Sequence, residues 1–189
     1  MITTIISALI SITAQESTLP EDSIYGLESQ WIDQNGRKLQ LKDFSTKPVI
    51  VSMVFLGCKY TCPLTIQDMR EMESSIIKNK VTDFRMVLIS IDPERDTPQA
   101  MKKFMGDRKL SEARWTIISS DPDNVRELAA LMGYSYKKDK AMEFAHSMLT
   151  WVFDEQGVLR FTRNARKESI SETVDALLKL HKVPKANLK

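Results

Sequence analysis

Cys58 and Cys62 are the only cysteines of this chain, and Pro63 directly follows the second of them. Proline suits the first turn of a helix and disfavours helical dihedrals in the residue before it. We therefore expect Cys62 at the N-cap of a helix and Cys58 in the preceding loop. The free N–H groups at a helix start stabilise a thiolate, so Cys62 should be more acidic than an ordinary thiol. Such a pair can close a disulfide, hold a soft metal ion, or do both in turn.

The elements around the cysteines indicate where a third functional residue lies. An apolar, β-branched run at 49–55 predicts a buried strand that ends just before Cys58, and 84–91 predicts a second strand. Right-handed crossovers bring the loops after such parallel strands to one edge of the sheet, where ligand sites form. His146 precedes an apolar hairpin whose first strand, antiparallel to the others, would start at that same edge. We therefore expect His146 beside both cysteines, although it lies 84 positions beyond Cys62.

The rest of the chain completes an α/β pattern. Asn35-Gly36, between two short extended segments, predicts a leading β-hairpin. Thr97-Pro98 and Asp121-Pro122 each combine a capping residue with a proline, and Ser169 to Glu172 forms a capping box, so each of these predicts a helix start. These signals predict a thioredoxin-like α/β fold, in which helices cover both faces of a mixed sheet and the β-hairpin is an N-terminal addition. Further strands are expected at 115–118, 148–153 and 158–161.

Length and composition limit the function classes. With 189 residues, of which 42% are hydrophobic, the chain suffices for one domain with a sizeable core. We place this domain at 25–183, with a tail at 184–189. The 27 basic and 25 acidic residues leave a net charge of +2, and no basic block is interleaved with aromatic residues. Nucleic acid is therefore not an expected partner.

The N-terminal segment indicates export. Residues 1–14 carry no charge and have an apolar centre. This stretch is shorter than the about 20 residues that span a membrane, but it suits a secretory signal or a short anchor. Residues 15–24 are polar and would form a tether. We therefore expect a periplasmic protein, or one at the outer face of the cytoplasmic membrane and tethered there through its N-terminus; a buried N-terminal segment is the alternative.

Two thiolates and one imidazole form a soft donor set of low coordination number. Soft sulfur donors select copper(I), while zinc usually needs a fourth ligand or a water molecule. His181, the only other histidine, is expected near the end of the last helix, where a dipole contact explains it. The residues therefore favour copper, with zinc as a competitor and with Cys58, Cys62 and His146 as the ligands.

Three separate motifs occur in one order along the chain. They are Cys58-Lys-Tyr-Thr-Cys62-Pro63 after an apolar strand, Asp92-Pro-Glu-Arg-Asp-Thr-Pro98 after the next strand, and His146-Ser147 before an apolar hairpin. Together they resemble the Sco/SenC family, and the resemblance runs from about Tyr25 to about Leu180. A bare pair of cysteines would be weak evidence, but three motifs in matching context are specific.

This resemblance implies a thioredoxin-like fold in an exported or membrane-tethered protein that binds copper through Cys58, Cys62 and His146. Family members help to assemble the copper centre of cytochrome c oxidase, either by delivering the metal or by reducing the receiving cysteines. The implied partners are the copper-receiving subunit of a respiratory oxidase and another copper chaperone. The chain departs from the family at 59–61, where a second proline is usual, and at Ala145, where an acid often precedes the histidine.

Three other interpretations of the cysteines stay open. A thiol–disulfide oxidoreductase of the ordinary thioredoxin kind has two residues between its cysteines and a cis proline before the hairpin strand, whereas this chain has three residues and Ala145-His146-Ser147. A peroxidase would leave His146 without a role. A redox or copper sensor would use the same site as a disulfide switch. Conventional enzymatic turnover is not expected, and any thiol–disulfide exchange by Cys58 and Cys62 would be ancillary.

Some further residues have simpler explanations. Met142 and Met148 flank His146, but methionine at core spacing is usually packing. Asp92 and Arg95 follow the second strand, so they are expected to form a rim of the cysteine edge. A basic stretch near the C-terminus is expected to form a solvated face, with docking to an acidic partner as the alternative. It comprises Arg160, Arg163, Arg166 and Lys167.

Overall fold

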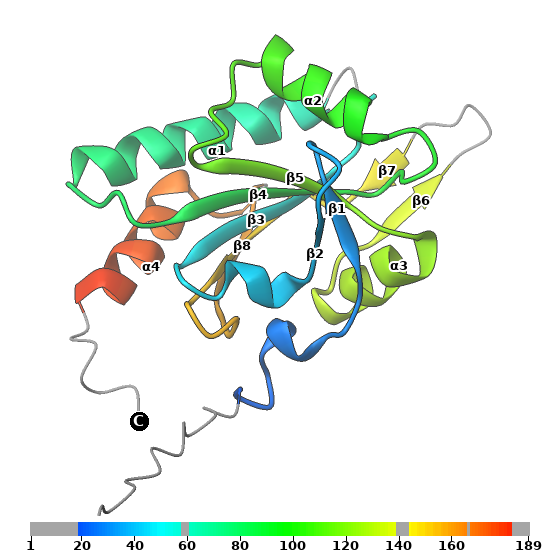
Figure 1. Ribbon diagram of the computed structural model, residues 1–189. Helices are drawn as coiled ribbons and strands as arrows, with labels where there is room; N and C mark the ends of the chain where they lie inside the picture. Colours follow the sequence, from blue (N-terminus) through cyan, green and yellow to red (C-terminus); the bar gives the residue numbers. More distant parts are fainter. Residues whose placement is uncertain (1–18, 58–60, 139–143, 166, 183–189) are drawn as a thin grey trace, which may run out of the picture.

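The computed structural model describes residues 19–57, 61–138, 144–165 and 167–182. Its centre is a seven-stranded mixed sheet in the order β2-β1-β5-β4-β3-β8-β9 (Figure 1). β3, β4 and β5 run parallel to one another, whereas β1 is antiparallel to β5 and β8 is antiparallel to β3. The strands of this sheet are β1 (Trp31–Asp33), β2 (Lys38–Leu39), β3 (Val49–Val54), β4 (Arg85–Ser90), β5 (Trp115–Ser119), β8 (Leu149–Phe153) and β9 (Leu159–Asn164).

Helices lie on both faces of the sheet, as expected from the sequence. α1 and α2 cover one face and α3 covers the other, while α4 packs beside α1 (Figure 1). The helices are α1 (Thr61–Lys78), α2 (Pro98–Asp107), α3 (Pro122–Leu131) and α4 (Ile170–Lys182), with short 3₁₀ turns η1 (Ile24–Gly26) and η2 (Leu41–Phe44). Within the described ranges, no helix combines the length and the apolar character that crossing a membrane requires.

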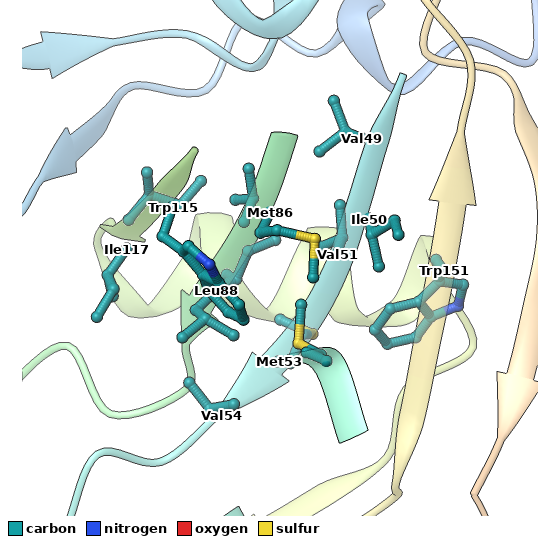
Figure 2. Packing of buried hydrophobic residues seen from close by; sticks show 14 of the residues in the cluster. Val49, Ile50, Val51, Met53, Val54, Met86, Leu88, Trp115, Ile117 and Trp151 are labelled. Atoms are coloured by element: carbon teal, nitrogen blue, oxygen red, sulfur yellow. The ribbon is translucent and has the colours of Figure 1, made fainter. Parts of the chain in front are cut away.

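The central strands are buried on both faces, which explains their unbroken apolar runs. Every residue of β3 is buried. Figure 2 shows Met53 and Met86 among the apolar side chains of this core, together with Leu88 and Trp151. Methionine therefore fills the core around the central strands, as its flexible side chain allows. The methionines that are almost fully buried are Met53, Met69, Met72, Met86, Met101 and Met105.

Local signals in the sequence give the correct turn and helix starts. β1 and β2 pair antiparallel across the turn that contains Asn35 and Gly36. The Thr97 hydroxyl accepts a hydrogen bond from a backbone N–H at the start of α2. The Asp121 carboxylate accepts two such bonds, at 3.0 and 2.9 Å, at the start of α3. One half of the predicted capping box forms, because the Glu172 carboxylate accepts a hydrogen bond from the Ser169 N–H at 2.8 Å.

The structure also contains a small second sheet that the sequence does not predict. β6 (Tyr136–Lys138) pairs antiparallel with β7 (Phe144–His146). Each strand has only three residues, which is too short for a periodic pattern to appear. His146 is therefore the last residue of a separate short strand before the chain enters β8.

Candidate metal and thiol site

The carboxyl-terminal ends of β3 and β4 define the edge of the sheet where the cysteine loop begins. These strands pair in parallel, from Val49 opposite Arg85 to Val54 opposite Ser90. β8 runs the other way and pairs with β3, so β8 begins where β3 ends. The loop after β3, the loop after β4 and the segment before β8 therefore share one edge, as the sequence predicts.

Cys62 lies two positions further into the helix than expected. α1 begins at Thr61, so Cys62 is its second residue and not its N-cap, and Pro63 is its third. Proline fits there because the first four N–H groups of a helix have no partner within the helix. Cys62 therefore stays in the first turn, where the helix dipole favours a thiolate. Cys58 lies outside the described residues.

His146 reaches the same edge along the backbone. In β7 it stands opposite Tyr136 of β6, and three hydrogen bonds join Ser147 to Ser135 just beyond. Ser52 of β3 pairs with Thr150 of β8. β7 ends at His146, three residues before Leu149, the first residue of β8. The joint ligand role of Cys58, Cys62 and His146 stays a prediction.

The loop after β4 contacts residues 55 and 56, which lie between the end of β3 and Cys58. Asp96 in this loop is only 4% exposed. Its Oδ2 accepts a hydrogen bond from the Ser90 hydroxyl at 2.6 Å and a longer one, at 3.5 Å, from the backbone N–H of Leu56. Leu56 lies two residues before Cys58. A buried carboxyl group therefore contacts the backbone immediately before the cysteine loop.

Arg95 adds a second contact to this segment. Its guanidinium carbon lies 4.6 Å from the centre of the Phe55 ring, a cation–π contact. The guanidinium also pairs with Asp92, which is 1% exposed and whose own N–H donates to the Ser90 hydroxyl at 3.0 Å. The residues Asp92 and Arg95 thus form a rim against the end of β3.

The surroundings of Asp96 change its acidity. Burial raises the pKa of Asp96 from 3.8 to about 6, although the hydrogen bonds from Ser90 and Leu56 favour the charged form. Asp92 raises this pKa further, and Arg95 lowers it. Asp96 therefore changes its charge in mildly acidic solution while in contact with the backbone before the cysteine loop.

In the basic stretch near the C-terminus, Arg160 and Lys167 are exposed as expected, whereas Arg163 is buried. Arg163 is 6% exposed, and its Nη1 lies 2.8 Å from Oδ2 of Asp68 in α1. Arg160 pairs with Asp154 at 2.6 Å. Arg166 lies outside the described residues. The sequence could not show that Arg163 is paired, because its partner is 95 positions away and carries no distinguishing motif.

The structure gives His181 the ordinary role that the sequence predicts. Its Nε2 lies 2.9 Å from the carbonyl oxygen of Asp83, and its Nδ1 lies 3.2 Å from that of Leu177. The imidazole therefore connects the end of α4 to the segment before β4. Met148 is half-buried, and Met142 lies outside the described residues.

Comparison with known proteins agrees with this architecture. The SCO1/SenC family model matches residues 18–181. An SCO2-like protein of Rickettsia felis is 30% identical over 151 residues, which cover 76% of this chain and 72% of that protein. The SCO1 protein homolog of Bacillus subtilis is 26% identical over 102 residues, 54% of this chain and 52% of that protein, so the match spans about half of its length.

The fold has a close counterpart among solved structures. ScoI of Arabidopsis thaliana, solved with copper bound, superposes with a TM-score of 0.72 at 20% identity, covering 81% of this chain and 95% of that one. At this identity the likeness concerns the fold, and it identifies the α/β layout of this chain as the thioredoxin-like layout of Sco structures. Since the family model also covers most of the sequence, the chain belongs to the SCO1/SenC family.

Proposed function

We propose that this protein is a copper chaperone that helps to build the copper centre of cytochrome c oxidase. Copper(I) is its cargo, and Cys58, Cys62 and His146 are its ligands. The observation that best supports this proposal is the backbone placement of Cys62 and His146. One lies in the first turn of α1 and the other ends β7, both at the edge where β3 ends. Membership of the SCO1/SenC family and the copper-bound Arabidopsis ScoI support the choice of metal.

The two cysteines and the histidine are chemically suited to bind copper(I). Thiolate sulfur and imidazole nitrogen are soft to intermediate donors, and copper(I) accepts two or three of them without further ligands. The first turn of α1 favours the thiolate form of Cys62, which is the form that binds metal. Asp96 and Arg95 contact the two residues that precede Gly57 and Cys58, and they would position the chain where it enters the metal site.

Metal delivery and thiol reduction are both compatible with this site. In delivery, copper(I) moves from the two thiolates and the imidazole to the ligands of the receiving subunit. In reduction, one thiolate of the Cys58–Cys62 pair attacks a disulfide of that subunit, displaces one target thiolate and forms a mixed disulfide. The second cysteine of the pair then attacks the mixed disulfide, which closes the Cys58–Cys62 disulfide and releases the second target thiolate, so two electrons pass to the target. Another copper chaperone would reload the reduced protein. Residues 1–14 support a location in the periplasm or at the outer face of the cytoplasmic membrane.

A copper titration of the ligand variants tests this proposal. The reduced protein should take up one copper(I) per chain in competition with a chromophoric chelator. His146→Ala should weaken the affinity by about tenfold or more because one donor is lost. The matched control is His181→Ala, since both ring nitrogens of His181 lie against backbone carbonyl oxygens, and it should leave the affinity unchanged.

Two outcomes would contradict the proposal. One is equal copper affinity in the wild type and in the Cys58→Ala, Cys62→Ala double variant. The other is an insulin-reduction activity comparable to that of a general thioredoxin and insensitive to His146→Ala, which would favour a thiol–disulfide oxidoreductase.

A further inference from the structure

A groove on the exposed side of α1 has no role in the proposed metal site. Its walls are side chains of α1 from Ile66 to Lys78, together with Arg108 just after α2, and its volume is about 640 Å³. We call it the α1 groove. Twelve residues of helix rise by about 18 Å, which matches about five residues of extended chain. The end at Ile66 lies four residues, about one helical turn, beyond Cys62.

The charge of the α1 groove is mainly positive. Arg70, Lys78 and Arg108 line it, against the single carboxylate of Glu71. None of these three cations forms an ion pair with a carboxylate of the described residues. Unpaired arginines that line a concave surface are suited to bind carboxylates, because each guanidinium can donate two parallel hydrogen bonds.

The two arginines are held in place by contacts within the protein. Arg70 donates from Nη1 to the backbone carbonyl oxygen of Arg108 at 3.2 Å. The guanidinium carbon of Arg108 lies 3.9 Å from the centre of the Phe104 ring. Both arginines are therefore anchored at the lining of one groove, where an anion would interact favourably with their charges. By contrast, Arg114 and Arg163, which also approach α1, each have a carboxylate of α1 as partner.

We propose that the α1 groove binds an extended acidic segment, about five residues long, of the protein that exchanges copper with this chain. The binding of an acidic segment is inferred from the cations and the length of the α1 groove, and only the identity of the partner protein rests on the proposed function. A protein segment fits better than a membrane surface because the cations line a hollow and not a flat face. A segment in this groove would end within about one helical turn of Cys62, so the rest of the partner would lie over the metal site.

A peptide-binding experiment tests the groove without copper. The probe is fluorescein-labelled hexaglutamate, and the readout is fluorescence anisotropy with the reduced, copper-free protein at about 50 and about 150 mM salt. Arg70→Gln combined with Arg108→Gln should weaken binding about tenfold or more. The control, Lys38→Gln combined with Lys42→Gln, removes the same charge from the exposed N-terminal hairpin region and should change the affinity less than about twofold. Arg70→Lys with Arg108→Lys keeps the charge and should recover part of the affinity.

The remaining outcomes distinguish a site for an acidic protein segment from a membrane-binding site. Equal peptide affinity in the wild type and the double glutamine variant would overturn the proposal. Binding to phosphatidylglycerol vesicles that this variant loses, without any peptide binding, would assign the groove to a membrane and would also overturn it. The double glutamine variant should bind copper(I) as the wild type does. If the wild type binds the peptide but no copper, the proposed function fails while the acidic-segment site stands.

Discussion

Asp96 is a buried acid whose ionised form opposes folding. Its carboxyl accepts hydrogen bonds from Ser90 and Leu56, yet burial still raises its pKa from 3.8 to about 6. The folded protein therefore holds this proton more tightly than the unfolded chain does. As a result, the contribution of Asp96 to the free energy of unfolding decreases as the pH rises from about 4 to about 6, and it stays low above that.

Asp96→Asn should stabilise the protein at pH 8 because the amide oxygen still accepts both hydrogen bonds while the buried charge is gone. The gain should be at most about 3 kcal/mol, from a pKa difference of about two units. It should shrink as the pH is lowered through about 6 towards about 4, where the wild-type carboxyl becomes protonated. Urea unfolding at several pH values measures the effect.

Asp33→Asn provides the matched control for this residue. Asp33 is also buried, but it pairs with Arg37 at 2.8 Å and accepts two backbone hydrogen bonds. The same substitution there should destabilise the protein at pH 8. A destabilising effect of both substitutions at pH 8 would contradict the account of Asp96.

At the scale of elements, α1 is the helix that carries Cys62, and it is joined to the sheet from two sides. Asp68 of α1 pairs with Arg163 of β9. Five residues further along α1, Glu73 accepts a hydrogen bond from Nε1 of Trp115 in β5 at 2.8 Å. These contacts join α1 to strands on both sides of β3, so they are expected to set where its first turn lies relative to β7.

Arg163→Met should destabilise the protein by about 2–4 kcal/mol, because it removes a buried partner and leaves the Asp68 carboxylate without its cation. Chemical unfolding of Arg163→Met, Asp68→Asn and the double variant measures this loss and the coupling of the pair. The loss in the double variant should be smaller than the two single losses combined.

The exposed ion pair Lys103–Asp107 is the control for this prediction. Its side chains are 76% and 54% exposed, so Lys103→Met should change the stability by less than about 0.5 kcal/mol. An equally small effect of Arg163→Met would show that the Asp68–Arg163 pair does not hold α1 in place.

At the scale of the whole molecule, the start of the described chain closes against its last hairpin. Ser23 bridges to Val158, and the Ile24 N–H donates to the carbonyl oxygen of Gly157 at 3.0 Å. The buried ring of Tyr25 lies directly over Gly157. The N-terminal segment is thus attached to the turn between β8 and β9, and β8 is the strand that follows His146.

Gly157→Ala should destabilise the protein by about 2–4 kcal/mol. Gly157 has a φ of +77°, and an added Cβ would lie 2.6 Å from atoms of the Tyr25 ring. Gly36 has the same φ with open space around it, so Gly36→Ala should cost only about 1 kcal/mol of backbone strain. Thermal unfolding compares the two variants. Equal losses of stability in the two variants would contradict the prediction, because they would mean that the close packing of Tyr25 on Gly157 adds nothing to the cost of the substitution.

The sequence by itself determined the features that depend on neighbouring residues. The turn at Asn35-Gly36, the helix starts at Thr97 and Asp121, and the buried central strands all follow from local dihedral preferences, capping and apolar periodicity. Topological rules also predicted which loops share an edge of the sheet. Right-handed crossovers and the direction of each strand place the loop after β3 and the segment before β8 at the same edge.

Tertiary structure decided what depends on residues distant in the chain. The short β6–β7 sheet, the burial of Arg163 against Asp68, and the contact of Asp96 with the Leu56 backbone have no local signature. The contacts of Arg163 and Asp96 arise because burial removes water from a polar group, which must then find a partner wherever the fold brings one.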